Sequence, residues 1–471
     1  MTTHVPALVV GAGISGLVCG YALRKSGIDA LVVESSSRPG GLIRSERRDG
    51  YLLELGPQSF LGTQPLLDLC RELNIESELL VAPPRAPRFI LVNGHLKRAP
   101  LSPSAFFASS LFNARTKWRV LRDALGHTKP PDADESIAAF VRRKFTPELL
   151  DEFVGPFVSG VYAGDPEKLS LRASFPQLHE AERSSGSIIR GMLHASKANS
   201  KSAEPKHKRP TLQSFREGNE TLVKALAAKL GSSLRLYTEA TSIRHTSADN
   251  PSPENKFIVS VRSEGANESI VADRLVLAAP TDSCAELLST LHPSSSATLG
   301  TIEYAPVAVL SLGYPKAAVG HALDGFGFLA PRSEKIRTLG TVWNSSLFPG
   351  RAPDGDVLLT SFLGGATDPG AVSLSPQELV ALNHKELTPI LSIRQAPSFS
   401  NVQIYERALP QYNLGHLDRI PSSEQMKLLD TNLWLVGNYL RGPSIGTCAE
   451  EALSVADEIH ARATMRQDRS P

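Results

Sequence analysis

The sequence is short of cysteine and has no long apolar run. Its four cysteines, Cys19, Cys70, Cys284 and Cys448, lie far apart, and no two of them have the CxxC spacing. This excludes a disulfide framework and the usual zinc-ligand spacings, so no metal site is expected, and it is typical of a reducing compartment. Because no stretch of about 18 uninterrupted apolar residues occurs, no membrane-spanning helix is expected either.

The sequence also lacks an excess of charge of one sign. The 50 Lys and Arg residues against 48 Asp and Glu residues leave a formal net charge of +2. Nucleic-acid binding needs a stronger basic excess, so we expect no nucleic-acid partner. The N-terminus has neither a basic n-region with a cleavage site nor an Arg- and Ser-rich leader, so no targeting peptide is expected. With 41% apolar and 21% charged residues, the 471 residues should form folded domains, about three by length.

The strongest positive signal lies in the first forty residues. The apolar run Val5–Val10 predicts a buried parallel strand and is followed by the glycine-rich turn Gly11–Gly16 and a helical pattern. A second apolar strand, Ala30–Val33, then ends at the acidic residue Glu34. A GxGxxG pattern alone is weak evidence, but strand, glycines, helix, strand and acid in this order predict a dinucleotide-binding unit.

Each glycine of the turn has a physical role in such a unit. Gly11 permits the tight turn, Gly13 lets the backbone approach a pyrophosphate, and Gly16 lets helix and strand pack closely. The pyrophosphate oxygens would meet the free N–H groups and the positive end of the helix dipole. The carboxylate of Glu34 can accept hydrogen bonds from both ribose hydroxyls and would repel a 2′-phosphate.

The residues after Glu34 decide between NAD and FAD. The segment Arg38–Ser45, RPGGLIRS, resembles the second glycine doublet of the large flavoprotein oxidase group. Adjacent glycines again bring backbone N–H groups to a phosphate, and Arg38 or Arg44 can neutralise its charge. NAD dehydrogenases do not share this extension, so the segment favours FAD.

A related arrangement occurs near the C-terminus. The apolar residues before Gly437 predict a strand, and the loop Gly442–Gly446 leads into a helix from about residue 447 to 462. A glycine-rich loop entering a helix presents N–H groups that stabilise negative charge, such as that developing on a flavin during reduction. Flavin-type sequence therefore lies at both ends of the chain, and we expect a dinucleotide domain assembled from discontinuous segments.

Several further motifs occur in order along essentially the whole chain. They are Gly11–Gly16, Arg38–Ser45, Gly56–Phe60, Ala86–Phe89, Phe157–Pro166, Gly325–Leu329, Ser346–Pro349 and Gly437–Tyr439. Together they resemble the oxygen-dependent protoporphyrinogen oxidase family, and the SGVYAGDP stretch within Phe157–Pro166 is specific to it. The resemblance implies non-covalent FAD and the oxidation of a porphyrinogen to a porphyrin in tetrapyrrole (heme) biosynthesis, with dioxygen reduced to hydrogen peroxide.

The fold that the resemblance implies is α/β. A Rossmann-like FAD-binding domain of the glutathione-reductase or amine-oxidase type should be joined by a mixed α+β substrate domain and a helical membrane-binding domain. The expected boundaries are 1–88, 211–295 and 425–471 for the FAD-binding parts, 89–210 for the helical domain and 296–424 for the substrate domain.

The resemblance also assigns site residues. The implied cofactor contacts are Gly11, Ala12, Gly13, Ile14, Ser15, Gly16, Glu34, Ser35, Arg38, Gly40, Gly41, Leu42, Gly56, Pro57, Gln58, Ser59, Ala240, Gly437, Pro443, Ser444 and Ile445. The implied substrate contacts are Arg88 for a propionate, Leu329 and Phe348 as apolar walls around the tetrapyrrole, and Gly160 and Gly164 on nearby backbone.

Elementary chemistry agrees with such a site. A porphyrinogen is a large apolar macrocycle with acidic propionates, so it needs apolar walls and one or two cationic anchors. Arginine suits the anchor because its planar fork binds a carboxylate bidentately. Without the resemblance, Arg88 is equally well explained as a surface ion pair, and Leu329 and Phe348 are better explained as core. No protein base is identified, so hydride abstraction is assigned to the flavin and no side chain is named as catalytic.

A membrane surface is the other expected contact. The stretch Leu101–Leu125 interleaves aromatic residues with arginine and lysine, as interfacial helices do, although an amphipathic core helix has the same pattern. We expect a cytoplasmic protein, peripherally associated with the cytoplasmic membrane if it is bacterial. Ferrochelatase and a second copy of the chain are the expected protein partners.

Three other functions remain open from the sequence. The motifs do not separate protoporphyrinogen IX from coproporphyrinogen III, which carries four propionates instead of two. Another flavin enzyme, such as an amine oxidase or a carotenoid desaturase, shares both glycine motifs. A flavin-free escort protein would keep the fold, but the intact Glu34 and Gly40-Gly41 argue against it.

Overall fold

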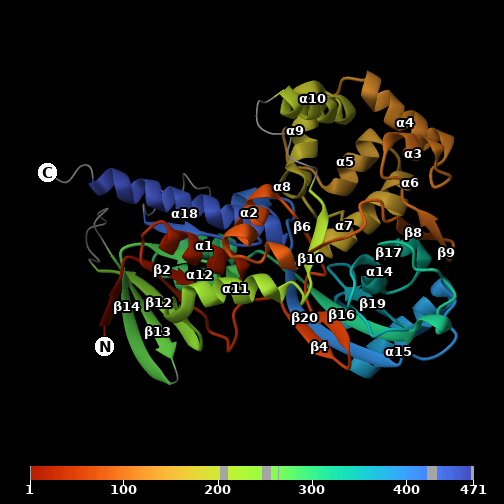
Figure 1. The fold of residues 1–471 in the computed structure, drawn as a ribbon. Helices are drawn as coiled ribbons and strands as arrows, with labels where there is room; N and C mark the ends of the chain where they lie inside the picture. Colours follow the sequence, from red (N-terminus) through yellow and green to blue (C-terminus); the bar gives the residue numbers. More distant parts are fainter. Residues whose placement is uncertain (1, 202–209, 247–255, 264, 422–431, 468–471) are drawn as a thin grey trace.

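A five-stranded parallel sheet forms the centre of one half of the molecule (Figure 1). The computed structural model describes residues 2–201, 210–246, 256–263, 265–421 and 432–467. The strands, in spatial order, are β11 (Leu234–Arg235), β3 (Ala30–Val33), β2 (Ala7–Val10), β15 (Leu275–Leu277) and β21 (Leu433–Leu435). They come from three distant parts of the sequence, so this sheet is assembled from discontinuous segments, as predicted.

Two layers cover the parallel sheet. The strands are apolar throughout, and alternate side chains enter opposite cores: Val9 lies in one cluster, and Leu8 and Val10 lie in the other. The first cluster packs under helices α1 (Ile14–Lys25), α2 (Gln64–Glu72), α11 (Glu220–Leu230) and α18 (Ile445–Gln467). The second packs against α12 (Thr281–Leu288), α13 (Pro293–Leu299) and a four-stranded sheet.

The predicted first strand is divided in two. Residues Val5–Val10 were expected to form one strand, but β1 (Thr2–Val5) ends before Pro6 and β2 begins after it. Proline has no N–H to donate to a sheet, so it marks the break. β1 pairs instead with β14 in the four-stranded sheet. The other strands of that sheet are β12 (Thr238–His245), β13 (Phe257–Ser263) and β14 (Ala266–Ala272).

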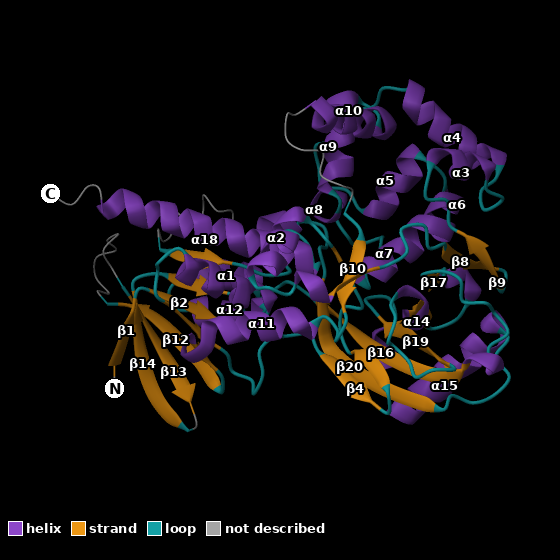
Figure 2. Cartoon of the chain, in the orientation of Figure 1, coloured by secondary structure: helices purple, strands orange, loops and turns teal. Residues whose placement is uncertain are grey.

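A seven-stranded sheet forms the core of the other half (Figure 2). Its strands, in spatial order, are β20 (Phe399–Pro410), β16 (Tyr304–Pro315), β19 (Asp356–Gly364), β18 (Thr338–Trp343), β17 (Gly327–Leu329), β8 (Arg88–Val92) and β9 (His95–Arg98). β8 pairs in parallel with β17 through Arg88 and Gly327. Residues 89–98, expected at the start of the helical domain, thus belong to the substrate sheet, because strand register is a long-range property that the local hairpin signal does not reveal.

A group of helices stands above this sheet (Figure 1). Its members are α3 (Pro103–Ala108), α4 (Ala114–Leu125), α5 (Ile137–Lys144), α6 (Pro147–Leu149), the π-helical turn η2 (Leu150–Val154), α7 (Gly155–Tyr162), α8 (Leu171–Ser174), α9 (Pro176–Ser185) and α10 (Ile188–Lys201). The stretch Leu101–Leu125 forms two helices, because the Asn113 side chain caps α4 by accepting the Thr116 N–H at 2.9 Å. None of the described helices is both long and apolar enough to cross a membrane.

Candidate active site: a dinucleotide cradle beside an apolar sheet face

The glycine-rich turn after β2 is packed too tightly for side chains at two positions. A Cβ on Gly16 would lie 1.9 Å from the carbonyl oxygen of Gly11, and Gly11 itself has a φ of +103°. By contrast, a Cβ on Gly13 would meet no atom within 4 Å. Gly13 is the N-cap of α1, and no side chain caps this helix end. Open space at an uncapped helix N-terminus fits the pyrophosphate of a dinucleotide.

Glu34 lies at the end of β3, beside this turn. One carboxylate oxygen accepts the Ala12 N–H at 2.8 Å, and the other accepts the Ser36 N–H at 2.9 Å. The carboxylate is therefore fixed at the edge of the surface that begins with the turn Gly11–Gly16, which we call the cofactor cradle. A ribose would lie at this edge. The backbone carbonyl of Glu34 accepts the Thr238 N–H, and this contact places the start of β12, which carries Ala240, next to the cradle.

The second glycine motif packs against the first. The Gly40 N–H donates to the carbonyl of Ala12 at 2.7 Å, and a Cβ on Gly41 would lie 3.5 Å from the Cα of Gly13. Both glycines have positive φ, +104° and +56°. Arg38 donates to the carbonyls of Pro39, Ile43 and Gly41. The Arg38 guanidinium thus stabilises the conformation of the loop through these three carbonyls.

The loop Gly56–Ser59 forms a third wall. A Cβ on Gly56 would lie 2.0 Å from the carbonyl of Leu42, so only glycine allows this approach. The buried side chain of Gln58 donates to the carbonyls of Glu54 and Gly56, each at 2.9 Å. The predicted cofactor residues on 11–16, 40–42 and 56–59 are therefore one continuous surface.

The C-terminal motif reaches the same place. The Val436 N–H donates to the carbonyl of Leu277, which aligns the end of β21 with the neighbouring strand of the parallel sheet. α18 packs along α1, and the Cys448 thiol in its first turn forms a hydrogen bond with Ser15. This packing of α18 on α1 brings the segment containing Pro443, Ser444 and Ile445 to the glycine turn near the N-terminus.

The seven-stranded sheet offers a half-buried apolar face to one side of the cradle. Its register pairs Leu329 with Gly340, and Gly340 with Phe362, so these residues share one face. Val342, two residues beyond Gly340, lies on that face as well. Leu329 and Phe362 are two strands apart, about 10 Å, with only a glycine between them. The Leu329 side chain leans over Gly340, since a Cβ there would lie 2.9 Å from its Cδ2 atom, so Leu329 and Phe362 form an apolar surface against which a macrocycle can pack.

Phe362 was not among the predicted residues. It lies in the run Asp356–Gly364, whose other apolar residues are buried, and nothing local distinguishes it from them. Only the pairing with β18 shows that Phe362 faces the same way as Leu329. The predicted Phe348 is 2% exposed and packs with Ala82 and Leu347, in the cluster against which Phe326 and Val342 also pack.

Gly160 and Gly164, the two glycines predicted to lie near the substrate, differ in their surroundings. A Cβ on Gly160 would lie 2.6 Å from the side chain of Leu329, so the structure brings these two predicted residues into contact. Phe157 and Val161 flank Gly160 on the exposed side of α7. Gly164 is buried instead: a Cβ there would lie 2.5 Å from Leu169 and 2.9 Å from Gln411. Gly164 therefore allows Leu169 and Gln411 to pack closely against the backbone. It follows Ala163, which is in the left-handed conformation with a φ of +47°.

Arg88 stands at the edge of the apolar face. Its guanidinium lies over the ring of Phe326 at 5.2 Å, and Phe326 packs in the same cluster as Val342. Arg88 is exposed to solvent by surface area, although neighbouring protein atoms lower its pKa through desolvation, and the described residues give its guanidinium no hydrogen-bond or ion-pair partner. A partly desolvated cation without a protein partner is suited to binding an external anion.

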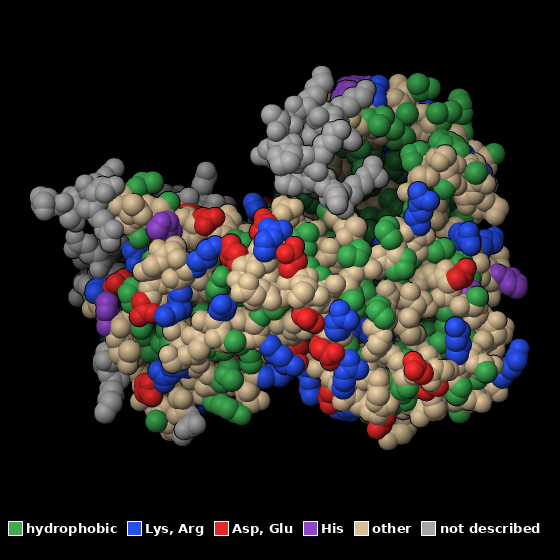
Figure 3. Space-filling model, viewed as in Figure 1, with side chains coloured by type: hydrophobic (Ala, Val, Ile, Leu, Met, Phe, Trp, Pro, Cys, Tyr) green, Lys and Arg blue, Asp and Glu red, His purple; other side chains and the backbone are tan. Residues whose placement is uncertain are grey.

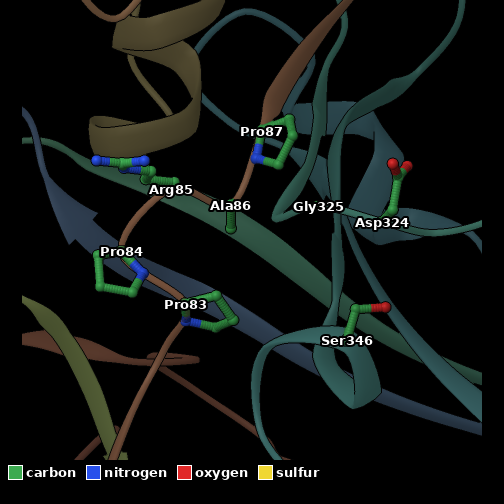
Figure 4. Close-up of a pocket in the computed structure, with 8 residues that line it drawn as sticks. All are labelled: Pro83, Pro84, Arg85, Ala86, Pro87, Asp324, Gly325 and Ser346. Atoms are coloured by element: carbon green, nitrogen blue, oxygen red, sulfur yellow. The ribbon is translucent and has the colours of Figure 1, made fainter.

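A cavity of about 540 Å³ lies next to Arg88. It is lined by Pro83, Pro84, Arg85, Ala86, Pro87, Asp324, Gly325 and Ser346 (Figure 4). Figure 4 shows the Arg85 side chain pointing away from Asp324 and Ser346 and toward a neighbouring helix. The cavity therefore extends the site beyond the start of β8, with a second arginine at its side.

Tyr405 connects the apolar face with the cradle. It is a half-buried residue of β20, opposite Val307. Burial raises the pKa of Tyr405, and the positive charges of Arg38 and Arg44 partly offset that increase. Those arginines belong to the second glycine motif, so the sheet face and the cofactor cradle adjoin.

A buried carboxyl group lies directly behind the cradle. Glu54, the last residue of β5 (Tyr51–Glu54), accepts the Ser45 hydroxyl at 2.6 Å and the Asn219 N–H at 2.8 Å. Desolvation raises the pKa of Glu54 from 4.5 to about 7, although the charge of Arg351 and both hydrogen bonds oppose the change.

This carboxyl group should make stability depend on pH. A folded-state pKa above the unfolded value stabilises the protein at low pH, and that stabilisation is lost as pH rises through about 7. The shift corresponds to at most about 3 kcal/mol. We expect the unfolding free energy of the wild type to fall between pH 5 and 8 relative to that of Glu54→Gln, measured by urea unfolding. Parallel pH profiles for the two proteins would contradict this prediction.

Comparison with known proteins gives consistent results. Residues 14–460 match the family model described as flavin-containing amine oxidoreductase. The chain is 37% identical to the chloroplastic protoporphyrinogen oxidase of rice, Oryza sativa subsp. japonica, over 96% of this chain and 87% of the relative. It is 27% identical to the coproporphyrinogen III oxidase of Bacillus subtilis, over 96% of this chain and 97% of the relative.

A solved structure from Exiguobacterium sp. 255-15 has the same fold. Its TM-score to this chain is 0.78 at 22% sequence identity, and the alignment covers 98% of this chain and 99% of the other. The fold is therefore shared, over nearly the whole length of both chains, with a protein of low sequence identity.

Proposed function

The chain belongs to the flavin-containing amine oxidoreductase family, and from that premise we propose that it oxidises protoporphyrinogen IX to protoporphyrin IX in heme biosynthesis. It is an FAD-dependent oxidoreductase. In the proposed reaction the macrocycle loses six electrons and six protons in three steps, and three dioxygen molecules leave as hydrogen peroxide. FAD, when bound, accepts the hydride of each step and passes the electrons to dioxygen.

The protein's own residues would hold the two reactants together. The glycine turns and Glu34 would hold the dinucleotide, because they present free N–H groups and a fixed carboxylate. Leu329, Val342 and Phe362 would exclude water from the macrocycle and orient it over Gly340. No side chain is assigned as a base.

One observation carries the choice of substrate: Arg88 has no recorded protein partner and stands at the edge of a half-buried apolar face. A macrocycle with propionates on one side has this combination of apolar surface and negative charge. The alternative, coproporphyrinogen III, is supported by the Bacillus subtilis relative at 27% identity. Its four propionates would need further cations, for which Arg85 is the nearest candidate.

The test is aerobic incubation of the purified, FAD-loaded protein with each porphyrinogen, following porphyrin fluorescence and peroxide together. Fluorescence and peroxide from protoporphyrinogen IX support the proposal, and turnover of coproporphyrinogen III alone supports the alternative. Turnover of neither would indicate another amine oxidase or desaturase activity. A colourless protein that does not bind added FAD would indicate the flavin-free escort function.

We propose in addition that the α4 surface contacts an anionic membrane from the cytoplasmic side. Trp118 and Leu125 are 61% and 75% exposed, and Leu121 lies beside them. Arg115 and Arg122 occupy the same side of the helix, and no carboxylate of the described residues pairs with them.

Met192 and Leu193 of the neighbouring α10 extend the apolar surface, and Figure 3 shows hydrophobic side chains gathered over these helices. Apolar and basic residues on one exposed face suit the interface of an anionic bilayer.

Substitution of this surface should release the protein from lipid. We expect Trp118→Glu/Leu125→Glu to reduce binding to vesicles containing anionic lipid at least about tenfold, because two exposed apolar groups are replaced by charges. Sedimentation with vesicles measures this. Leu61→Glu, at another exposed leucine far from α4 in sequence, is the matched control. Equal binding of all three proteins would contradict the proposal.

Ferrochelatase and a second copy of the chain are the two protein partners proposed. Protoporphyrin is poorly soluble, which supports its direct transfer to ferrochelatase. The homodimer stays a prediction.

A further inference from the structure

A buried polar network joins the cofactor cradle to the substrate sheet. On the cradle side it contains Glu54 and Gln58, which begin and support the loop Gly56–Ser59. On the substrate side it contains Asn344 and Arg351, from the connection between β18 and β19. Glu54 and Arg351 have side chains only 1% exposed, and Asn344 is buried as well.

The first link across the boundary is direct. The Asn344 side-chain N–H donates to the side-chain oxygen Oε1 of Gln58 at 2.7 Å. Gln58 in turn donates to the carbonyls of Glu54 and Gly56. A residue of the substrate sheet therefore reaches the backbone of a cradle loop through a single intervening side chain.

The second link passes through Arg351. Its guanidinium donates to the Ser214 hydroxyl at 2.6 Å and to the carbonyl of Phe215 at 3.2 Å. The Ser214 hydroxyl donates to Asn219 at 2.9 Å, and the Asn219 amide donates to the carbonyl of Pro57 at 2.8 Å. Arg351 is thus connected to the same loop by a chain of hydrogen bonds.

A buried carboxyl group and an aromatic ring lie beside this second link. An Arg351 nitrogen lies 3.8 Å from a Glu54 carboxylate oxygen, and the guanidinium lies 5.4 Å from the centre of the Phe348 ring. Buried arginine and glutamate side chains are costly to leave unpaired, so the pair resists rearrangement. The Phe348 ring therefore packs beside Arg351 as well as against Phe326 and Val342.

We propose that Arg351 and Asn344 are positioning residues that hold the loop Gly56–Ser59 against the substrate sheet. They set the separation between the flavin and the substrate. The pyrophosphate would be held at the N-terminus of α1, in another part of the cradle, so loss of either residue should misplace the ring end of the cofactor and leave its affinity nearly unchanged. A displacement of about 1 Å between reacting groups costs about a hundredfold in rate.

The variants are Arg351→Met, Arg351→Lys and Asn344→Ala, with Arg337→Met as the matched control. Arg337 is another arginine of the substrate sheet, in a part-buried ion pair with Asp368 at 2.7 Å, and it has no recorded contact with the cradle. Three quantities are measured. They are hydrogen exchange of the loop with its two ends, residues 55–60, in the apoprotein, the dissociation constant for added FAD, and kcat and KM for protoporphyrinogen IX. The Leu55 N–H, which donates to the carbonyl of Arg44 at 2.9 Å, is the protected amide of this segment.

We expect Arg351→Met to accelerate exchange in residues 55–60, at the Leu55 amide above all, at least about tenfold and to lower kcat by about 10- to 100-fold, with KM and FAD affinity within about threefold. Arg351→Lys keeps the charge and should recover part of kcat. Asn344→Ala removes one hydrogen bond and should show faster loop exchange even if Arg351→Met does not fold.

Loop exchange no faster in Arg351→Met and Asn344→Ala than in Arg337→Met would overturn the proposal. So would a fall in thermal stability with kcat unchanged. Only the turnover readout rests on the proposed function; if neither porphyrinogen is oxidised by the wild type, loop exchange still decides the positioning role.

Discussion

Replacing Gly13 with valine is expected to abolish FAD binding while the apoprotein keeps its fold. Gly13 is the N-cap of α1, with a φ of −64° that valine can adopt. A Cβ there meets no protein atom within 4 Å, so the side chain would enter open space. That space lies at the uncapped end of the helix, where the pyrophosphate would be held. The valine methyl groups would occupy the position of the phosphate oxygens.

The expected loss is about 100-fold or more in FAD affinity, because the phosphate charges would lose the helix N-terminus and several N–H donors. Titration of the apoprotein with FAD, followed by quenching of flavin fluorescence, measures this. The melting temperature of the apoprotein should change by only a few degrees, since the substitution costs less than about 1 kcal/mol at an N-cap.

Gly370→Val is the matched control for Gly13→Val. A Cβ at Gly370 also meets no atom within 4 Å, and this glycine lies in the turn η6 (Pro369–Ser373), outside the cradle. It should bind FAD as the wild type does. A yellow Gly13→Val protein with unchanged FAD affinity would mean that the pyrophosphate does not lie at the end of α1.

The sequence predicted the cofactor half of the molecule well because its signals are local. Gly11, Gly16 and Gly56 are needed where one backbone segment approaches another within a distance that no Cβ permits, and each such glycine stands in a short motif. Even the convergence of chain ends was predictable, since a strand that ends in glycine before a helix occurs at both ends. Pro6 lies inside the apolar run Val5–Val10, and the apolar pattern alone does not reveal that this proline divides the run between two strands.

The substrate half was harder to predict because its geometry depends on strand register. Phe362 and Leu329 face the same space only because Gly340 pairs with both of them. Arg88 belongs to the same sheet only because β8 pairs with β17, more than 200 residues later in the sequence. Phe348 is buried and packs with Phe326 and Val342, so its place beside a substrate stays a prediction.

Replacing Arg88 with alanine is expected to weaken substrate binding while the flavin is retained. The Arg88 guanidinium has no recorded protein partner that alanine would leave unpaired, and it lies on β8, outside the segments that form the cofactor cradle. Removing a partly desolvated cation that binds a propionate costs about 2 to 4 kcal/mol, or about 30- to 1000-fold in kcat/KM. Because the anchor acts before and during the reaction alike, most of the loss should be in KM.

Two companion variants separate charge from packing. Arg88→Lys keeps the charge but loses the bidentate fork and the planar stacking on Phe326, so it should recover only part of the loss. Arg98→Ala, on the adjacent strand β9 opposite Phe89, removes an arginine from the same sheet without removing the anchor and should behave as the wild type.

Steady-state kinetics with porphyrin fluorescence, and flavin absorbance of each protein, measure the outcome. If Arg88→Ala loses its yellow colour instead, or turns over substrate with an unchanged KM, Arg88 supports the fold or the cofactor and the carboxylate anchor lies elsewhere, with Arg85 beside the adjoining cavity as the next candidate.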